Sequence, residues 1–268
     1  MRIHKIKLIH SAAPNRGLKA ADKSAALSIN PEPIRLRSGL SPEPGRRTEQ
    51  TPAFRPGYVE GLIIFDLDGT LVNAYTAIIK SFNYTMRKVN APVQKGRIIR
   101  RAVGWGDKNL LKPFVKRDAL DRALVIYRAH HTQALLQWSR VIPGVKGLLT
   151  ALKKKGRKLA VASNRPAKFT QILIRHLKIK PYFDYVLCAD ELKHGKPHPE
   201  ILNAIMRKLS AKPSQTIYVG DMAIDIRAGK RAKVKTIAVT GGSSMRAELK
   251  KEKPDLILKR AADLLKML

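Results

Sequence analysis

The stretch GLIIFDLDGT at residues 61–70 joins a short apolar run to two closely spaced acids. The run at residues 61–65 contains β-branched residues and no charge, which is typical of a buried parallel strand. Asp66 and Asp68 follow directly, and two carboxylates beside an apolar strand are costly unless something compensates them. A polar turn explains one Asp but not two. We therefore expect a magnesium ion here, because Mg²⁺ prefers oxygen ligands.

Strands and helices alternate along the chain beyond residue 142. Their spacing predicts, in order, a helix at 145–155, a strand at 158–163, a helix at 166–177, a strand at 185–189, a helix at 199–209, a strand at 216–220, a helix at 224–232, strands at 236–240 and 255–258, and a terminal helix. This order is typical of an α/β protein with a doubly wound, Rossmann-like parallel sheet. Such sheets bind ligands at the carboxyl ends of their strands, so we expect the chemistry there.

A helical segment interrupts this alternation. Residues 75–141 have helical apolar spacing, with breaks at residues 91–92 and 104–106. We interpret them as a small inserted α-helical cap domain. The α/β core domain then consists of residues 58–74 and 142–268.

The N-terminal residues 1–57 differ in composition from the rest of the chain. They are basic, rich in Pro and Ser, and without helical or strand periodicity, which predicts a disordered extension. An organellar transit peptide is one alternative interpretation. A true start near Val59 is another, because the folded pattern begins abruptly at Tyr58.

The second strand ends in Ser163 and Asn164, and Pro166 begins the helix that follows. The unpaired N–H groups at a helix start, together with the Ser163 hydroxyl, are suited to hold an anion. Taken alone, this pattern is also an ordinary helix cap. We include Ser163 and Asn164 as candidate phosphate-binding residues because they lie at a strand end.

Lys196 lies in a basic loop between Gly195 and Pro197, a rigid setting that can direct its ammonium group inward. A lone lysine in a loop is more often solvated, so this assignment depends on the other strand ends. His194 and His198 flank Lys196. We find no third metal ligand near them in the sequence and interpret both as exposed or packed against the loop.

The fourth strand ends in Asp221, and Asp225 follows four residues later. This spacing puts Asp221 at the strand tip and Asp225 in the first turn of the next helix. Asp221 is suited to complete the metal site begun by Asp66, with Asp225 supporting it. A favourable charge at a helix N-terminus explains Asp225 without a metal, but it does not explain Asp221.

These four strand ends, taken in order, resemble the four motifs of the haloacid dehalogenase superfamily. The resemblance covers about residues 60–268 and is closest to the phosphoglycolate phosphatase-like branch. It rests further on the stretches FDLDGTLV, IPGV, GKP and DIRAG, which begin at Phe65, Ile142, Gly195 and Asp225.

The resemblance implies a magnesium-dependent phosphatase that hydrolyses a small phosphate monoester. Asp66 would attack phosphorus and form an aspartyl-phosphate, while Asp68 would act as general acid and base. Magnesium would be held by Asp66, the carbonyl of Asp68 and Asp221, with Asp225 orienting the site. Family members that cleave carbon–halogen bonds lack the second acid, so Asp68 favours a phosphatase.

The resemblance also implies how the phosphoryl group is held and what the cap does. Ser163, Asn164 and Lys196 would neutralise the phosphoryl oxygens. The cap would close over the site and supply specificity. Between Lys95 and Arg128 it carries ten Lys or Arg against three Asp. Four residues around its central break are candidates for contacting a substrate carboxylate or a second phosphate: Arg100, Arg101, Trp105 and Lys108. Alternatively, Trp105 packs within the cap and the cations are solvated.

The composition bounds the partners of the protein. The chain has 268 residues, a formal net charge of +33 and one cysteine, Cys188, which excludes an intramolecular disulfide and a cysteine metal cluster. Its apolar runs are short, so we expect a cytoplasmic protein without a membrane partner. The charge attracts anions, and we expect a small phosphorylated metabolite as the partner. Alternatively, the basic side chains only keep the surface solvated and bind no partner.

Two other functions fit parts of the sequence. A sugar-phosphate mutase of the same fold would pass the phosphoryl group from the aspartyl-phosphate to another hydroxyl. A polynucleotide-end phosphatase or nucleic-acid-binding protein would use the positive charge on a phosphate backbone. We expect no specific nucleic acid partner, because the sequence has no aromatic-rich stacking surface and no recognition motif.

Overall fold

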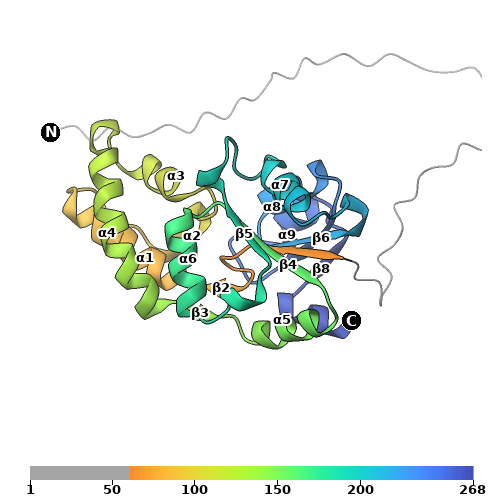
Figure 1. The fold of residues 1–268 in the computed structure, drawn as a ribbon. Helices are drawn as coiled ribbons and strands as arrows, with labels where there is room; N and C mark the ends of the chain where they lie inside the picture. Colours follow the sequence, from red (N-terminus) through yellow and green to blue (C-terminus); the bar gives the residue numbers. More distant parts are fainter. Residues whose placement is uncertain (1–60, 268) are drawn as a thin grey trace, which may run out of the picture. The chain divides into compact units, whose positions relative to one another are not determined.

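The computed structural model describes residues 61–267 (Figure 1). The predictions for residues 1–57, including the alternative start and the transit peptide, lie outside the described residues. In the described part of the chain, no helix is both long and apolar enough to cross a membrane.

A parallel sheet of six strands forms the centre of the described residues, in the order β5-β4-β1-β6-β7-β8. All neighbouring strands in it pair in parallel. The strands are β1 (Leu62–Phe65), β4 (Lys158–Ser163), β5 (Tyr185–Cys188), β6 (Thr216–Gly220), β7 (Lys235–Val239) and β8 (Leu256–Leu258). This topology confirms the predicted α/β, Rossmann-like fold.

Helices cover both faces of the sheet. They are α5 (Val145–Lys154), α6 (Ala167–His176), α7 (Glu200–Lys208), α8 (Ala223–Arg231) and α9 (Arg246–Lys251), and a 3-10 helix, η6 (Ala261–Met267), ends the described chain. Side chains alternate across a strand, so Ile63 and Phe65 of β1 pack in the core that includes α5, α6 and η6. Leu62 and Ile64 face the opposite core, which includes α7 and α8.

The predicted helical segment begins and ends at a small second sheet. Its helices are α1 (Tyr75–Lys88), α2 (Gly96–Ala102), α3 (Asp107–Leu111) and α4 (Leu120–Trp138). Strand β2 (Val72–Asn73) pairs antiparallel with β3 (Arg140–Val141), which brings the two ends of the segment together. In Figure 1, α1 and α4 lie side by side, apart from the main sheet. We call residues 75–141 the helical insert.

The predicted elements differ from the observed ones in three ways. Most helix and strand ends shift by one residue, as expected where ends fray. The terminal helix is a 3-10 helix rather than an α-helix. The two strands of the small sheet were not predicted, because two residues are too few to show the alternation that marks a strand.

Candidate active site

The carboxyl ends of the three central strands meet at one edge of the sheet. β1 lies between β4 and β6 and pairs in parallel with both. Asp66 follows β1, Ser163 ends β4, and Asp221 follows β6. Side chains from three separate stretches of the sequence therefore lie side by side, at the edge where parallel sheets bind ligands.

A tight loop after β1 brings the backbone close to Asp221. Gly69 has a φ of 87°, a left-handed conformation that other residues rarely adopt, and its N–H donates to Val72 O (2.8 Å). A Cβ atom at residue 69 would lie 2.4 Å from Tyr75 Oη and 2.6 Å from Asp221 Oδ2. Both the backbone conformation and the close approach therefore require glycine at this position.

Lys196 is the centre of a buried polar network. Its Nζ donates to Asp66 Oδ1 (2.6 Å) and Asp225 Oδ1 (2.8 Å), and it also contacts Tyr218 Oη (2.9 Å) and Ala162 O (3.1 Å). Tyr218 in turn donates to Asp225 Oδ1 (2.8 Å). Burial lowers the pKa of Lys196, but Asp225 and Asp66 raise it well above its ordinary value. The ammonium group therefore stays charged, as the prediction of an inward-facing Lys196 requires.

Three buried carboxylates gather beside Lys196. Asp66, Asp221 and Asp225 each offer an oxygen within 4.8 Å of the others. Burial raises the pKa of Asp66 and of Asp221, repulsion between carboxylates adds to it, and Lys196 opposes it. Among residues 61–267, Asp221 has no cationic hydrogen-bond partner. An all-oxygen donor set with more negative charge than one ammonium balances fits Mg²⁺.

The loop that follows β7 fixes Asp221. The Ser243 N–H donates to Asp221 Oδ2 (2.7 Å), and the hydroxyls of Thr70 and Tyr75 lie 3.3 and 3.4 Å from its two oxygens. A Cβ atom at residue 242 would lie 1.7 Å from Asp221 Oδ2, so only glycine lets this backbone approach. Asp221 thus has a fixed orientation in which its oxygens face the acidic cluster.

Ser163 and Asn164 have different surroundings. Ser163 is buried, and its Oγ accepts the Arg165 N–H (3.1 Å), which leaves its own hydroxyl proton to be donated elsewhere. Asn164 bonds to the backbone of Lys196 on both sides, through Oδ1 to its N–H (2.9 Å) and through Nδ2 to its O (3.0 Å). Its Nδ2 also donates to Gly104 O (2.8 Å) in the helical insert. Asn164 therefore positions the lysine loop and joins it to the insert.

Arg165 is not among the predicted site residues, yet it contacts the second acid. Its Nε donates to Asp68 Oδ2 (2.9 Å) and its Nη2 donates to Asp68 Oδ1 (2.7 Å). Its Nη1 lies 2.8 Å from His131 Nε2, on α4 of the helical insert. Asp68 is thus held by a bidentate ion pair, which is among the stronger polar contacts in proteins.

One cavity is lined by five of the predicted site residues: Asp66, Asp68, Ser163, Asn164 and Lys196. Arg165 contributes to its polar wall. Its apolar wall comes from the helical insert, with Ile78, Val103, Leu110 and Tyr127, and equally from the rest of the protein, with Pro166, Phe169, Met222 and Ile224. A small polar ligand in this cavity would lie between the strand ends and the insert.

Four predicted specificity residues do not line this cavity: Arg100, Arg101, Trp105 and Lys108. Arg100 donates to the backbone oxygens of Gly241 and Gly242 (2.7 and 3.1 Å). Arg101 donates to Ser243 O (3.2 Å) and pairs with Glu248. The two arginines therefore join α2 to the loop that holds Asp221.

Trp105 and Lys108 are next to residues that line the cavity, but they do not line it themselves. Trp105 is 45% exposed, so it does not pack within the helical insert as the alternative interpretation proposed. The Lys108 backbone N–H donates to the Asp107 carboxylate (2.8 Å), near the start of α3. This geometry does not bring either side chain to the predicted site.

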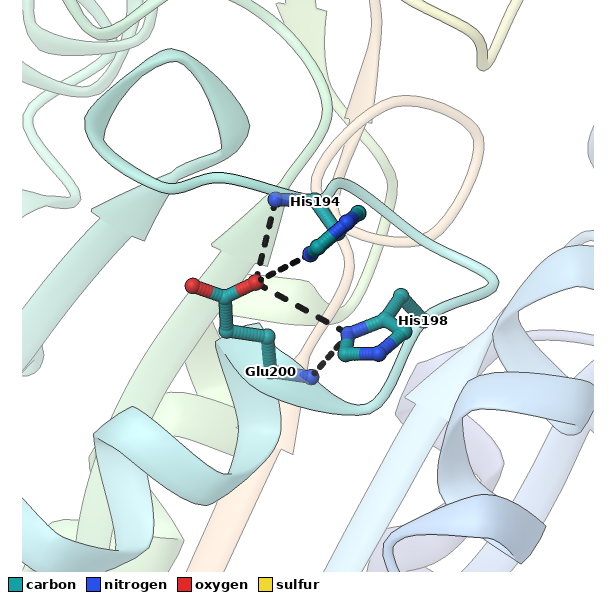
Figure 2. Close-up of side chains that lie close together, drawn as sticks. All are labelled: His194, His198 and Glu200. Atoms are coloured by element: carbon teal, nitrogen blue, oxygen red, sulfur yellow. Dashed lines mark hydrogen bonds and ion pairs between the residues drawn. The ribbon is translucent and has the colours of Figure 1, made fainter.

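A side-chain cluster supports the loop on both sides of Lys196 (Figure 2). The Glu200 carboxylate accepts the N–H groups of Lys193 and His194 and contacts His194 Nδ1 (3.0 Å), while His198 Nδ1 lies 3.8 Å from it. The prediction that no third potential ligand stands near the two histidines is therefore wrong, because Glu200 lies between them. These hydrogen bonds explain the cluster as the closure of the lysine loop onto the start of α7.

The fold and the site define an α/β enzyme with an acidic centre at its strand ends. The chain belongs to the haloacid dehalogenase-like hydrolase family, whose model matches residues 63–239. This confirms the resemblance drawn from the four motifs.

Its relatives include phosphatases of two kinds. A pyrophosphatase PpaX of Bacillus mycoides is 33% identical, over 77% of this chain and 95% of its own. A phosphoglycolate phosphatase of Aquifex aeolicus is 30% identical, over 77% of this chain and 96% of its own. The crystal structure of a predicted phosphoglycolate phosphatase from Haemophilus somnus matches with a TM-score of 0.74 and 30% identity, covering 78% of this chain and 98% of its own.

Several residues of the site carry no clear signal in the sequence. Arg165 directly follows the predicted pair at the end of β4, so its position alone could have indicated it. His131 lies within α4 and reaches the site only through the packing of the helical insert. Ser243 contributes its backbone N–H, which no side-chain pattern reveals.

Proposed function

We propose that this protein is a magnesium-dependent phosphatase that hydrolyses a small acidic phosphate monoester, phosphoglycolate or a close analogue. The observation that carries the proposal is the position of Asp66. It lies 2.6 Å from Lys196, joins the buried carboxylates of Asp221 and Asp225, and lines the same cavity as Asp68. A nucleophilic carboxylate, an acid, a cation and a metal-type donor set thus lie together.

Asp66 acts as the nucleophile in this proposal. Its Oδ1 is bonded to Lys196, while its Oδ2 has no hydrogen-bond partner among residues 61–267. Oδ2 attacks phosphorus, the bond from phosphorus to the substrate alkoxide breaks, and an aspartyl-phosphate forms. Asp68 gives its proton to the departing alkoxide.

The second half of the reaction reverses these roles. Asp68, now a carboxylate, removes a proton from water, and the water oxygen attacks phosphorus. The bond between phosphorus and Asp66 then breaks, which releases inorganic phosphate and restores both carboxyl groups. Lys196 and the free hydroxyl proton of Ser163 neutralise the phosphoryl oxygens. Asn164 keeps Lys196 in place through the lysine backbone.

We propose that Mg²⁺ is held by Asp66, the carbonyl of Asp68 and Asp221, with Asp225 orienting Lys196. When bound, the ion would offset the negative charge of the phosphoryl group and the carboxylates. The raised pKa of Asp66 and of Asp221 supports this, because burial and repulsion disfavour their charged forms until a cation is present.

We propose that the helical insert acts as a cap domain over a core formed by residues 58–74 and 142–268. The hydrogen bonds from Asn164 to Gly104 and from Arg165 to His131 support this, because they join residues at the strand end to residues of the insert that line the same cavity. A cap in contact with the site excludes bulk water from the aspartyl-phosphate, so that hydrolysis uses the water molecule that Asp68 activates.

Pyrophosphate is a second candidate substrate, because one relative with 33% identity is named a pyrophosphatase. Both candidates carry a second anionic group beside the scissile bond. The mutase alternative draws its support from fold alone, since the putative β-phosphoglucomutase of Thermotoga maritima matches at 22% identity. We therefore place hydrolysis first.

Phosphate release from a panel of phosphorylated compounds tests the proposal. The panel contains phosphoglycolate, pyrophosphate, ethyl phosphate, a sugar phosphate and a 3′-phosphorylated oligonucleotide, each with Mg²⁺ and with chelator. We expect magnesium-dependent release that is highest on phosphoglycolate. Isomerised sugar phosphate without free phosphate would favour a mutase, and release from the oligonucleotide alone would favour the polynucleotide-end phosphatase.

A further inference from the structure

Arg165 is a buried cation that the proposed hydrolysis does not use. It is only 8% exposed, it follows Asn164 at the end of β4, and it lines the cavity. Of the five N–H donors of a guanidinium, three are bonded, two to Asp68 and one to His131. The remaining two have no partner among residues 61–267. Arg165 therefore has donors left over in the cavity that the substrate enters.

The ion pair between Arg165 and Asp68 conflicts with the role of Asp68 as an acid. Both carboxylate oxygens of Asp68 accept hydrogen bonds from the guanidinium, at 2.9 and 2.7 Å. Because the guanidinium occupies both oxygens, neither is free to carry a proton to the leaving group. Asp68 must leave Arg165 before it can act, and a buried guanidinium without an anion is strongly unfavourable. Another anion has to take its place.

His131 fixes the guanidinium on its other side. Burial and the nearby Arg165 together lower the pKa of His131 to about 2, so the ring is neutral. Its Nδ1 bonds to Ser81 Oγ (3.0 Å) and its Nε2 faces Arg165, which makes Nε2 the acceptor of the Arg165 Nη1 hydrogen bond. The ring lies between Tyr127 and Phe169. The guanidinium therefore keeps its position when Asp68 leaves.

We infer that Arg165 binds a second anionic group of the substrate, a carboxylate or a phosphate next to the scissile phosphoryl group, and that this anion displaces Asp68 and frees it to act as the acid. The inference rests on the proposed phosphatase function and adds the substrate class that the site selects. Arg165 is suited to the task because a guanidinium forms two parallel hydrogen bonds with either anion. A monoester without a second anionic group leaves Asp68 paired with Arg165 and is hydrolysed more slowly.

Binding to an inactive background tests the inference without turnover. Titration calorimetry compares phosphoglycolate with ethyl phosphate, which has the same chain length and no carboxylate, in Asp66→Asn and in Asp66→Asn combined with Arg165→Gln. We expect phosphoglycolate to bind about 10- to 100-fold more tightly than ethyl phosphate when Arg165 is present, the range for hydrogen bonds to a charged group. Arg165→Gln should remove most of this difference, and Arg165→Lys should restore part of it.

Pyrophosphate in the same titration distinguishes the two anions. If Arg165→Gln weakens pyrophosphate but not phosphoglycolate, the second anion is a phosphate, and the reverse result identifies a carboxylate. Arg227→Gln is the matched control, because Arg227 makes two hydrogen bonds to Glu252 and neither residue lines the cavity. It should leave the preference unchanged. Thermal melting of each variant shows whether it is folded.

The outcomes separate the inference from the proposed function. In Arg165→Gln, equal losses for ethyl phosphate and both doubly anionic ligands would overturn the role of Arg165. So would an unchanged preference for both phosphoglycolate and pyrophosphate over ethyl phosphate. In the active protein, Arg165→Gln should lower kcat/KM for phosphoglycolate. The kcat/KM for ethyl phosphate should stay equal or rise, because Asp68 is no longer paired with Arg165. If the protein with intact Asp66 hydrolyses no monoester but the binding preference follows Arg165, the phosphatase proposal fails and the anion site stands.

Discussion

At the scale of single residues, Lys196 and Asp225 explain how three buried acids are tolerated at one strand edge. Lys196 bonds to Asp66 and Asp225, and Tyr218 bonds to both Lys196 and Asp225. A buried charge is stable only when it is paired and hydrogen-bonded. Asp221 lacks such a cation among the described residues, which supports the proposed metal ion at this site.

The buried histidine of α4 makes stability depend on pH. The folded-state pKa of His131, about 2, lies below its ordinary value of 6.5 because burial and Arg165 disfavour the charged ring. The unfolded chain therefore binds a proton more readily than the folded one, and stability falls as pH drops below 6.5. One such group contributes a loss of about 2 kcal/mol in unfolding free energy between pH 7 and pH 5.

Urea unfolding at pH 5, 6 and 7 measures this loss. His131→Gln should be less stable at pH 7, because the ring packs between two aromatic side chains, but its stability should depend less on pH. An equal change with pH in both proteins would show that His131 titrates normally in the folded state.

Sequence patterns predicted the site best where a residue type has few structural roles other than the functional one. Paired aspartates after apolar strands pointed to Asp66, Asp68 and Asp221, and the structure brings all three to one edge of the sheet. Arg165 and His131 were missed because a basic residue after a strand, or a histidine on a helix, is common and gains its role only from long-range packing. Arg100 and Arg101 of α2 were expected to contact the substrate because of their charge. Charge alone does not show where a side chain points, and both arginines bond to the loop after β7 instead.

At the scale of elements, α2 and the loop after β7 form a connection between the helical insert and the metal-type site. Arg100 and Arg101 donate to backbone oxygens of this loop, and the same loop donates the Ser243 N–H to Asp221. Movement of the helical insert would therefore shift the loop and, through it, the position of Asp221. The predicted breaks at residues 91–92 and 104–106 are confirmed on either side of α2, so sequence patterns located this helix but not its contacts.

Arg101→Gln separates a connecting role from a substrate-binding role. The ion pair with Glu248 is exposed, so we expect a change of less than about 1 kcal/mol in unfolding free energy. Loss of the connection should lower kcat/KM by roughly three- to tenfold, and equally for phosphoglycolate and ethyl phosphate. Steady-state kinetics with both substrates provides the measurement. A selective loss on phosphoglycolate would instead support contact between Arg101 and the substrate carboxylate.

The main sheet was predictable because parallel strands buried on both faces give continuous apolar runs between helices of regular length. The strands at residues 158–163 and 216–220 match the observed β4 and β6. The helical insert was predicted as helical but not as four α-helices, since the 3-10 turns near residues 112–119 show no break in the apolar spacing.

At the scale of the whole molecule, the excess of positive charge extends over the part of the chain that carries the site. Residues 61–268 hold 42 of the 53 Lys and Arg and 15 of the 20 Asp and Glu. A positive field around an anion site raises the local concentration of anionic substrates. The charge is therefore consistent with a small phosphorylated substrate and does not require a nucleic acid partner.

The central claim is that Asp66 is the nucleophile of a magnesium-dependent phosphatase. Phosphate release from phosphoglycolate by the unmodified protein and by Asp66→Asn, each with Mg²⁺ and after chelation, tests it most directly. We predict release that requires Mg²⁺ and falls at least about 10³-fold in Asp66→Asn, as for other nucleophile replacements, while the melting temperature shows that the variant is folded. Near-unchanged release by the folded variant would contradict the account.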